Sequence, residues 1–207
     1  MRLRFLSLAG SHLPPPRAAW WGMLLLAAGL TGCLGLKPSV DATRFYVLTA
    51  TAETGAVVAG ETVTLGRVDL PDYIRTPRMA IRASANEIVY SDLHQWAEPL
   101  EDAVPRVIEE NLLRQLGSQR FRSGPAPAHL VAHEIQLEIL RFDLEPAGFA
   151  VVEAVGRRVH HETRELEWQQ PLSYRIPFHY DPTSLAPAAS ALSEALAQLT
   201  LGVSPHY

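Results

Sequence analysis

Histidine and glutamate residues stand side by side at two places in this sequence, where they could bind a metal ion. His133 precedes Glu134, and His160, His161 and Glu162 follow one another. Neighbouring side chains on a strand point to opposite faces and rarely bind one ion together, and no HExxH spacing places two histidines on one helical face. We expect no metal site: the loop histidines should be exposed and His133 hydrogen-bonded within a sheet.

The sequence contains no recognisable set of residues for nucleophilic catalysis. A GxSxG motif and a glycine-rich phosphate loop are both absent, and the sole cysteine, Cys33, follows an apolar N-terminal segment. A Ser-His-Asp arrangement scattered through the chain stays open, because one sequence cannot reveal it. We expect no catalytic residues, no cofactor and no enzymatic activity.

The N-terminal segment has the features of an export signal. It contains Arg2, Arg4 and Arg17, no acidic residue, and an uncharged run over residues 18–30. That run of about 13 residues gives roughly 20 Å of helix, too short for a hydrocarbon core of roughly 30 Å. A basic start, a short apolar run and small residues after it are typical of a cleaved signal peptide, which we place at residues 1–32.

The signal ends in Leu30, Thr31, Gly32 and Cys33, which together resemble the lipobox of bacterial lipoproteins. The resemblance implies acylation of the Cys33 thiol, cleavage after Gly32 and acylation of the new amino group; several acyl chains anchor a protein stably. Residue 34 is leucine, not the aspartate that tends to retain lipoproteins in the inner membrane of Gram-negative bacteria. We therefore expect a protein anchored at Cys33 on the periplasmic face of the outer membrane.

The rest of the chain has the size of one domain on a short tether. Without the three arginines of the signal it carries 15 basic and 22 acidic residues, about −7 in net charge, which argues against sequence-independent nucleic-acid binding. A single cysteine excludes an intramolecular disulfide, so stability must come from an apolar core. We expect a lipidated tether over residues 33–41 and one domain over residues 42–207.

Alternation of apolar and polar residues predicts that much of the domain is β-strand. The expected strands cover residues 43–50, 62–70, 78–83, 87–90, 130–144, 149–159 and 165–178. The third and fourth of these flank Ser84-Ala85-Asn86 and should form a hairpin. The strand over residues 130–144 alternates along its whole length, and residues 51–60 are expected to form a flexible loop.

Two helices are expected, over residues 99–116 and 184–201. In the first, apolar residues recur on one face: Leu100, Val104, Val107, Ile108, Leu112 and Leu116. Pro99 suits the first helical position and Gly117 suits the end, while Pro105 should kink the first turn or delay the start. Ser184 or Thr183 should cap the second helix. The order of elements predicts a mixed α/β domain with helices packed on a sheet.

Six segments of the chain carry a family resemblance: residues 44–48 (RFYVL), 68–74 (VDLPDYI), 77–82 (PRMAIR), 94–100 (HQWAEPL), 110–112 (ENL) and 191–196 (ALSEAL). Together, and in this order, they resemble the PqiC/YmbA-type lipoproteins, the auxiliary lipoprotein family of ABC-type transport systems. The resemblance is weak over about residues 145–182, and Pro105 and the loop over residues 123–128 have no counterpart. It implies a single-domain, three-layer α/β sandwich with a mixed sheet.

The resemblance also implies a function and partners. Family members accompany MCE-domain proteins and a membrane permease, so we expect a non-enzymatic component of an intermembrane phospholipid transport system that supports envelope integrity. It would dock onto the periplasm-spanning MCE-domain protein, with a ring of identical subunits as one form of assembly. Two alternatives stay open: a periplasmic lipid-binding carrier with its own hydrophobic pocket, and a lipid-anchored hydrolase.

Tyr73 and Trp96 are the candidate contacts for a partner. Each lies in a connection that resembles the family, over residues 69–74 and 94–99 respectively, and aromatic side chains in loops are enriched at interfaces. The sequence favours the alternative, in which both side chains cap the sheet edge and anchor their loops in the core.

Overall fold

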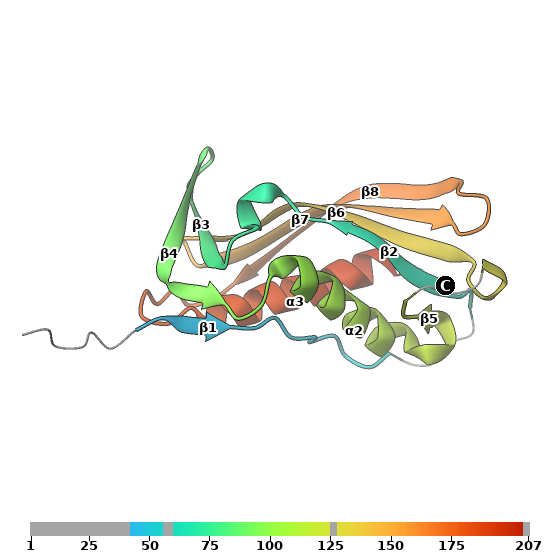
Figure 1. Ribbon diagram of the computed structural model, residues 1–207, viewed down its shortest axis with the longest axis horizontal. Coiled ribbons are helices and arrows are strands. Elements are labelled where there is room, and N and C mark those ends of the chain that lie inside the picture. The colour runs from blue at the N-terminus through green and yellow to red at the C-terminus, as the bar shows by residue number, and fades with distance from the viewer. Residues whose placement is uncertain (1–41, 56–59, 125–127, 205–207) are drawn as a thin grey trace, which may run out of the picture. The chain divides into compact units, whose positions relative to one another are not determined.

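A mixed sheet of eight strands and a pair of α-helices build the described part of the chain (Figure 1). The computed structural model describes residues 42–55, 60–124 and 128–204, which form one compact unit. The strands are β1 (Arg44–Tyr46), β2 (Val63–Asp69), β3 (Arg78–Ser84), β4 (Glu87–Trp96), β5 (Phe121–Arg122), β6 (His133–Glu145), β7 (Phe149–His160) and β8 (Leu166–Pro177). The helices are α2 (Leu100–Arg120) and α3 (Ala186–Val203), with 3-10 turns η1 (Asp72–Ile74) and η2 (Ala128–Leu130).

Strand β6 organises the sheet, because three strands share its two edges. Along one edge β2 pairs in parallel with the first half, and β3 pairs in parallel near the end, where Ile81 lies opposite Leu144. The other edge pairs with β7 in antiparallel fashion over its length, and β8 follows β7. The expected β3–β4 hairpin is confirmed; β1 adds to β4 and β5 adds to β2, both in parallel.

Three layers make up the sandwich. Both helices cover the same face of the sheet, and the segment after β1 runs across the helices on the side away from the sheet (Figure 1). Hydrogen bonds hold this segment there: Thr49 N donates to Ser193 Oγ (3.2 Å) and Ala52 N donates to Asn111 Oδ1 (2.9 Å). The expected α/β sandwich with a mixed sheet in one domain is confirmed.

The N-terminal strand is shorter than the alternation over residues 43–50 predicts. Only Arg44–Tyr46 pair with the sheet, because the backbone beyond them turns to the helices and buries Leu48 in the core. The expected loop over residues 51–60 is fixed at its start, where Gly55 N donates to Arg114 O (3.0 Å). Residues 56–59 of that loop lie outside the described part.

Helix α2 has the predicted apolar stripe, but its first and last residues differ from the prediction. All six stripe residues are buried, and Pro99 precedes the helix at the N-cap. The delayed start predicted from Pro105 is wrong: the helix starts at Leu100 and the backbone φ and ψ stay helical through Pro105, although the proline has no N–H to donate to Glu101 O. The break comes instead at Gly117, whose φ of 71° and ψ of 165° suit glycine.

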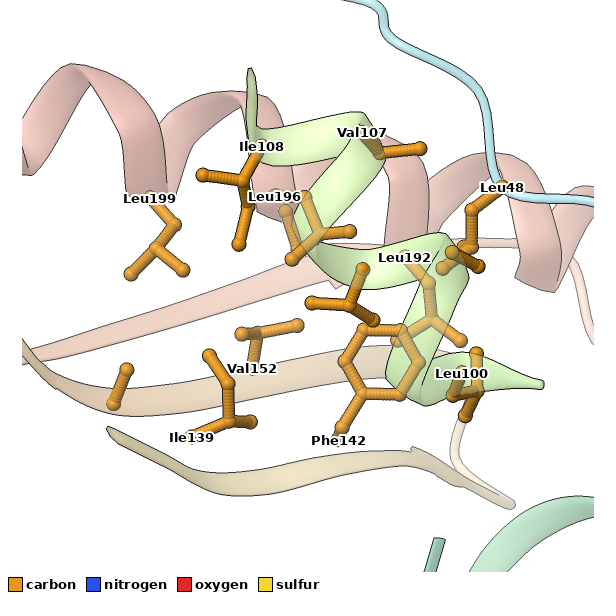
Figure 2. Packing of buried hydrophobic residues seen from close by; sticks show 14 of the residues in the cluster. Leu48, Leu100, Val107, Ile108, Ile139, Phe142, Val152, Leu192, Leu196 and Leu199 are labelled. Atoms are coloured by element: carbon orange, nitrogen blue, oxygen red, sulfur yellow. The ribbon is translucent and has the colours of Figure 1, made fainter. Parts of the chain in front are cut away.

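Helix α3 completes the core with small and branched apolar residues. Its side chains Leu192, Leu196 and Leu199 meet those of α2 and of the sheet, such as Ile108 and Phe142 (Figure 2). The predicted cap is wrong. The N-cap is Leu185, with no capping side chain, and Thr183 instead donates its hydroxyl to Asp181 Oδ1 (2.7 Å).

Strand β6 contains a bulge that the alternation did not predict. The register with β7 shifts between Ile139 and Arg141, which leaves Leu140 half exposed and exchanges the faces of the strand. Phe142 and Leu144 are therefore buried beneath the helices, whereas Asp143 points to the opposite face of the sheet. The first residues also differ from the prediction, since Leu130 belongs to η2 and the strand begins at His133.

Candidate functional site

The two connections that resemble the family come together in the structure. Strand β4 extends to Trp96, well beyond the expected end at Tyr90. Its end, and the connection to α2 that follows it, therefore lie next to the connection between β2 and β3. Trp96 N donates to Pro77 O (2.6 Å), which joins the two, and Ala97 N donates to Tyr46 O (2.8 Å). Two connections that are well separated in sequence therefore form one surface.

Tyr73 anchors the β2–β3 connection to the sheet. Its hydroxyl accepts a hydrogen bond from Phe142 N (2.9 Å) beside the bulge and donates one to Asp143 Oδ2 (3.0 Å). The Tyr90 hydroxyl donates to Tyr73 O (2.8 Å). Burial raises the pKa of Tyr73 to about 12, so the phenol stays protonated and can donate to the carboxylate. The half-buried ring is a structural anchor for its connection.

Asp143 is the centre of a covered ion-pair network on the outer face of the sheet. Its side chain is inaccessible to solvent, and it accepts hydrogen bonds from Arg82 Nε (2.9 Å) and Arg141 Nε (2.9 Å) in addition to Tyr73. The network continues from Arg141 to Glu145 (2.7 Å). Hydrogen bonds from arginines lower the pKa of Glu145. These charges are mutually satisfied and hold strands β3 and β6 together.

Trp96 lies in the core rather than on the surface. Its residue is 6% exposed, and its ring centroid lies 6.3 Å from that of Phe142. The structure therefore agrees with anchoring of both loops in the core. A partner contact through these connections remains a prediction, and it must involve the exposed atoms of the loops.

A groove of about 310 Å³ opens between the two connections. Its walls are formed by Arg75, Thr76, Pro77, Trp96, Ala97, Glu98, Pro99, Leu100 and Glu101. Charged groups of both signs stand at the rim: Arg75 Nε lies 4.0 Å from Glu101 Oε1, and Glu98 Oε1 accepts from Arg106 Nη2 (2.5 Å). An apolar floor with a polar rim is the composition of many protein contact sites.

The histidine groups do not form a metal centre in the described ranges. His133 is buried and lies between two carboxylates, with Nε2 2.5 Å from Glu61 Oε2 and Nδ1 2.8 Å from Glu167 Oε2. Within residues 42–55, 60–124 and 128–204, no three His, Cys, Asp or Glu side chains are placed to hold a metal ion.

The expectation that His160 and His161 are exposed is wrong, and of the two only His161 lies in the turn between β7 and β8. His160 ends β7 opposite His133, and His161 Nδ1 lies 3.6 Å from Glu134 Oε2; both residues are half-buried. The turn between β7 and β8 starts later than expected, which brings both rings against the sheet.

The anchoring residues predicted from the sequence lie outside the described part. This applies to the signal peptide over residues 1–32, to Leu30, Thr31, Gly32 and Cys33, and to the tether up to residue 41. No helix among the residues that are described is both long and apolar enough to cross a membrane.

The geometry defines an α/β sandwich whose two anchored connections border a surface groove. The chain belongs to the family of ABC-type transport auxiliary lipoprotein components, whose profile matches residues 46–203. The match includes both connections, and it confirms the resemblance seen in the sequence. None of the curated proteins compared with the chain matches it.

Two solved structures share the fold. The crystal structure of an uncharacterized protein superposes with a TM-score of 0.64 at 17% identity, covering 78% of this chain and 95% of the other. A protein from Xanthomonas campestris gives a TM-score of 0.59 at 19% identity, covering 77% and 91%. A PelC dodecamer from Paraburkholderia phytofirmans has a TM-score of 0.37 at 15% identity, covering 69% and 92%; this likeness is too distant to bear on assembly.

Proposed function

We propose that this chain is the outer-membrane lipoprotein of an MCE-type intermembrane phospholipid transport system. In this proposal it docks a periplasm-spanning MCE-domain protein, acts beside the permease of the same system, and performs no catalysis. Membership of the transport auxiliary family is the observation that carries the proposal. The groove between the two family-like connections supports docking as its mode of action.

The anchor in this proposal is the acylated Cys33. Residues 1–32 are removed as the signal peptide, residues 33–41 form the tether, and residues 42–207 form the working domain. Leu34 in place of aspartate supports sorting to the periplasmic face of the outer membrane. This location would place the domain at the outer end of a periplasm-spanning partner.

Cys33→Ser should abolish lipidation and leave an uncleaved precursor at the inner membrane, because acylation requires the thiol. Labelling cells with radioactive palmitate measures this directly. Equal label in the variant and the natural protein would show that Cys33 is not the acylated residue. Leu34→Asp is the companion variant: it should keep the label and move the protein towards the inner membrane, and unchanged fractionation would contradict the proposed sorting.

The proposal of a docking protein without catalytic activity agrees with the way in which the buried charged groups are paired with one another. The buried Asp143 carboxylate is held by Arg82 and Arg141, and the buried His133 ring lies between the carboxylates of Glu61 and Glu167. The cavity between Trp96, Phe142 and Leu192 in the core has a volume of about 10 Å³, room for one water and far too little for an acyl chain, and the larger hollows of about 310 and 420 Å³ lie among exposed residues. Neither feature favours the hydrolase or the carrier.

Ala97→Trp should block the groove and weaken binding of the MCE-domain protein about thirty-fold, the effect of losing a contact worth about 2 kcal/mol. Ala97 is exposed and lines the groove, so its substitution should leave the melting temperature unchanged. Ala85→Trp, an identical change at the exposed β3–β4 turn, is the control. Pull-down of the MCE-domain protein encoded beside this chain measures both variants.

Three outcomes would contradict the docking proposal. The natural protein would fail to bind its neighbour, Ala85→Trp would weaken binding as much as Ala97→Trp, or the protein would hydrolyse a lipid at a rate abolished by one side-chain change. Trp96→Ala should lose stability and binding together, because the indole is buried. Cross-linking of the membrane-bound protein tests for a ring of identical subunits in the same samples.

A further inference from the structure

Three large apolar side chains are exposed where the chain enters the domain. Phe45 is 62% exposed, Val47 53% and Leu93 51%. Phe45 lies beside Gln95 in the register of β1 with β4, and Leu93 precedes Gln95 by two residues, so alternation places both apolar side chains on one face. Val47 follows Phe45 by two residues, directly after the end of β1, and is also exposed. We call Phe45, Val47 and Leu93 the β1 patch.

The covalent path from the acylated cysteine leads directly to the β1 patch. Eight residues, 34–41, separate Cys33 from the described chain. Fully extended, the chain from Cys33 to Phe45 reaches at most about 40 Å, and any less extended tether brings the patch closer. Strand β1 is the first element after the tether and lies at the opposite end of the domain from the β7–β8 turn (Figure 1). The β1 end is therefore the end held nearest to the bilayer.

Positive charge accompanies the apolar side chains. Arg78 is exposed and lies opposite Gln95 on β3, so that Phe45, Gln95 and Arg78 form one row across three strands, whereas Arg44 lies on the other face of β1 and interacts with Asp181. Arg78 also lies 3.4 Å from Asp92, which offsets part of its charge. Cations beside an apolar surface favour the anionic head groups of a phospholipid bilayer. A cation beside the patch favours such head groups locally, although the mature chain as a whole has a net negative charge.

We propose that the β1 patch rests in the head-group region of the membrane and fixes the orientation of the domain on it. The proposal depends on the acylation of Cys33 described above, because three side chains alone bind a bilayer weakly and the anchor supplies a high local concentration. Ala97, which lines the groove, donates its N–H to the carbonyl of Tyr46 (2.8 Å), the residue before Val47. The docking groove would thus open beside the membrane surface, where a partner bound in it also meets lipid.

Fluorescence quenching on vesicles tests the β1 patch. Since the Cys33 thiol is acylated in the mature lipoprotein, Leu93→Cys supplies a single reactive thiol for an environment-sensitive dye. The labelled protein is reconstituted into phosphatidylethanolamine–phosphatidylglycerol vesicles containing a lipid with a nitroxide on its upper acyl chain. Loss of fluorescence is expected at position 93. Leu166→Cys, 57% exposed at the start of β8, is the matched control and should keep its fluorescence.

Disruption of the β1 patch completes the test. Phe45→Ser with Val47→Ser should restore the fluorescence at position 93, while the protein still floats with the vesicles through its acyl chains. Equal fluorescence at positions 93 and 166 would overturn the proposal. Disulfide-linked pairs of the unlabelled Leu93→Cys variant would overturn it as well, because they would assign the patch to a second copy. Failure of the acylation itself is distinguishable, because that protein would carry no palmitate and would not float.

Discussion

Asp143→Ala is expected to lower the free energy of unfolding by about 3–5 kcal/mol, the usual result of removing one partner from a buried ion pair. The Asp143 carboxylate is fully covered, and Arg82 and Arg141 beside it are 22% and 18% exposed. Without the carboxylate, two guanidinium groups face each other and the Tyr73 hydroxyl loses its acceptor. Urea unfolding of the mature protein, followed by circular dichroism, measures the loss.

Two variants separate this effect from a general loss of charge. Asp72→Ala removes a carboxylate 3.2 Å from Arg75, but the Asp72 side chain is 97% exposed, so no measurable change is expected. Asp143→Asn keeps one acceptor oxygen and should fall between the natural protein and Asp143→Ala. If Asp143→Ala unfolds at the same urea concentration as Asp72→Ala, the network does not stabilise the fold.

Leu112→Ala should cost about 2–5 kcal/mol, because the change leaves a cavity between α2, α3 and the sheet. Leu112 is completely buried and belongs to the main apolar cluster. Thermal unfolding followed by calorimetry measures the effect as a lowered melting temperature.

The neighbouring leucine is a matched control for this prediction. Leu113 is 44% exposed on the outer side of α2, so Leu113→Ala should have a much smaller effect. Glu109→Ala, which removes a contact with the Ser123 hydroxyl at an exposed position, should also cost little. Equal shifts for Leu112→Ala and Leu113→Ala would mean that the helix presents a different face to the core.

Local patterns predicted most elements because each pattern follows from one buried face. The stripe from Leu100 to Leu116 predicted the buried face of α2, and alternation predicted β7 and β8 at nearly their full lengths. The predictions fail where a contact between residues that are far apart in the sequence determines the local backbone conformation. Thr49 leaves the strand pattern because Ser193 is there to receive its N–H, and the helical backbone at Pro105 persists because the surrounding turns are packed in the core.

The site could be predicted only in part, for the same reason. Resemblance to the family pointed to the loops of Tyr73 and Trp96, but the hydrogen bond between Trp96 and Pro77 that joins them depends on the tertiary fold. The sequence did not indicate Asp143, because strict alternation assigns it to the buried face of β6 together with Arg141. The adjacent apolar pair Ile139-Leu140 was the available signal, since two such residues in succession on a strand are compatible with a bulge.

The extended segment across the helices has a consequence for the order in which the chain folds. Its hydrogen bond from Thr49 to Ser193 joins residues that are 144 positions apart, and β1 pairs with β4 residues that are 50 positions further along the chain. Contacts of such sequence separation form late, because closing a long loop costs entropy before any contact compensates for it. A chain delivered across a membrane with its N-terminus first cannot complete this layer until α3 has emerged. Residues 44–52 would therefore be the last part of the domain to pair, after the proposed acylation site has already crossed.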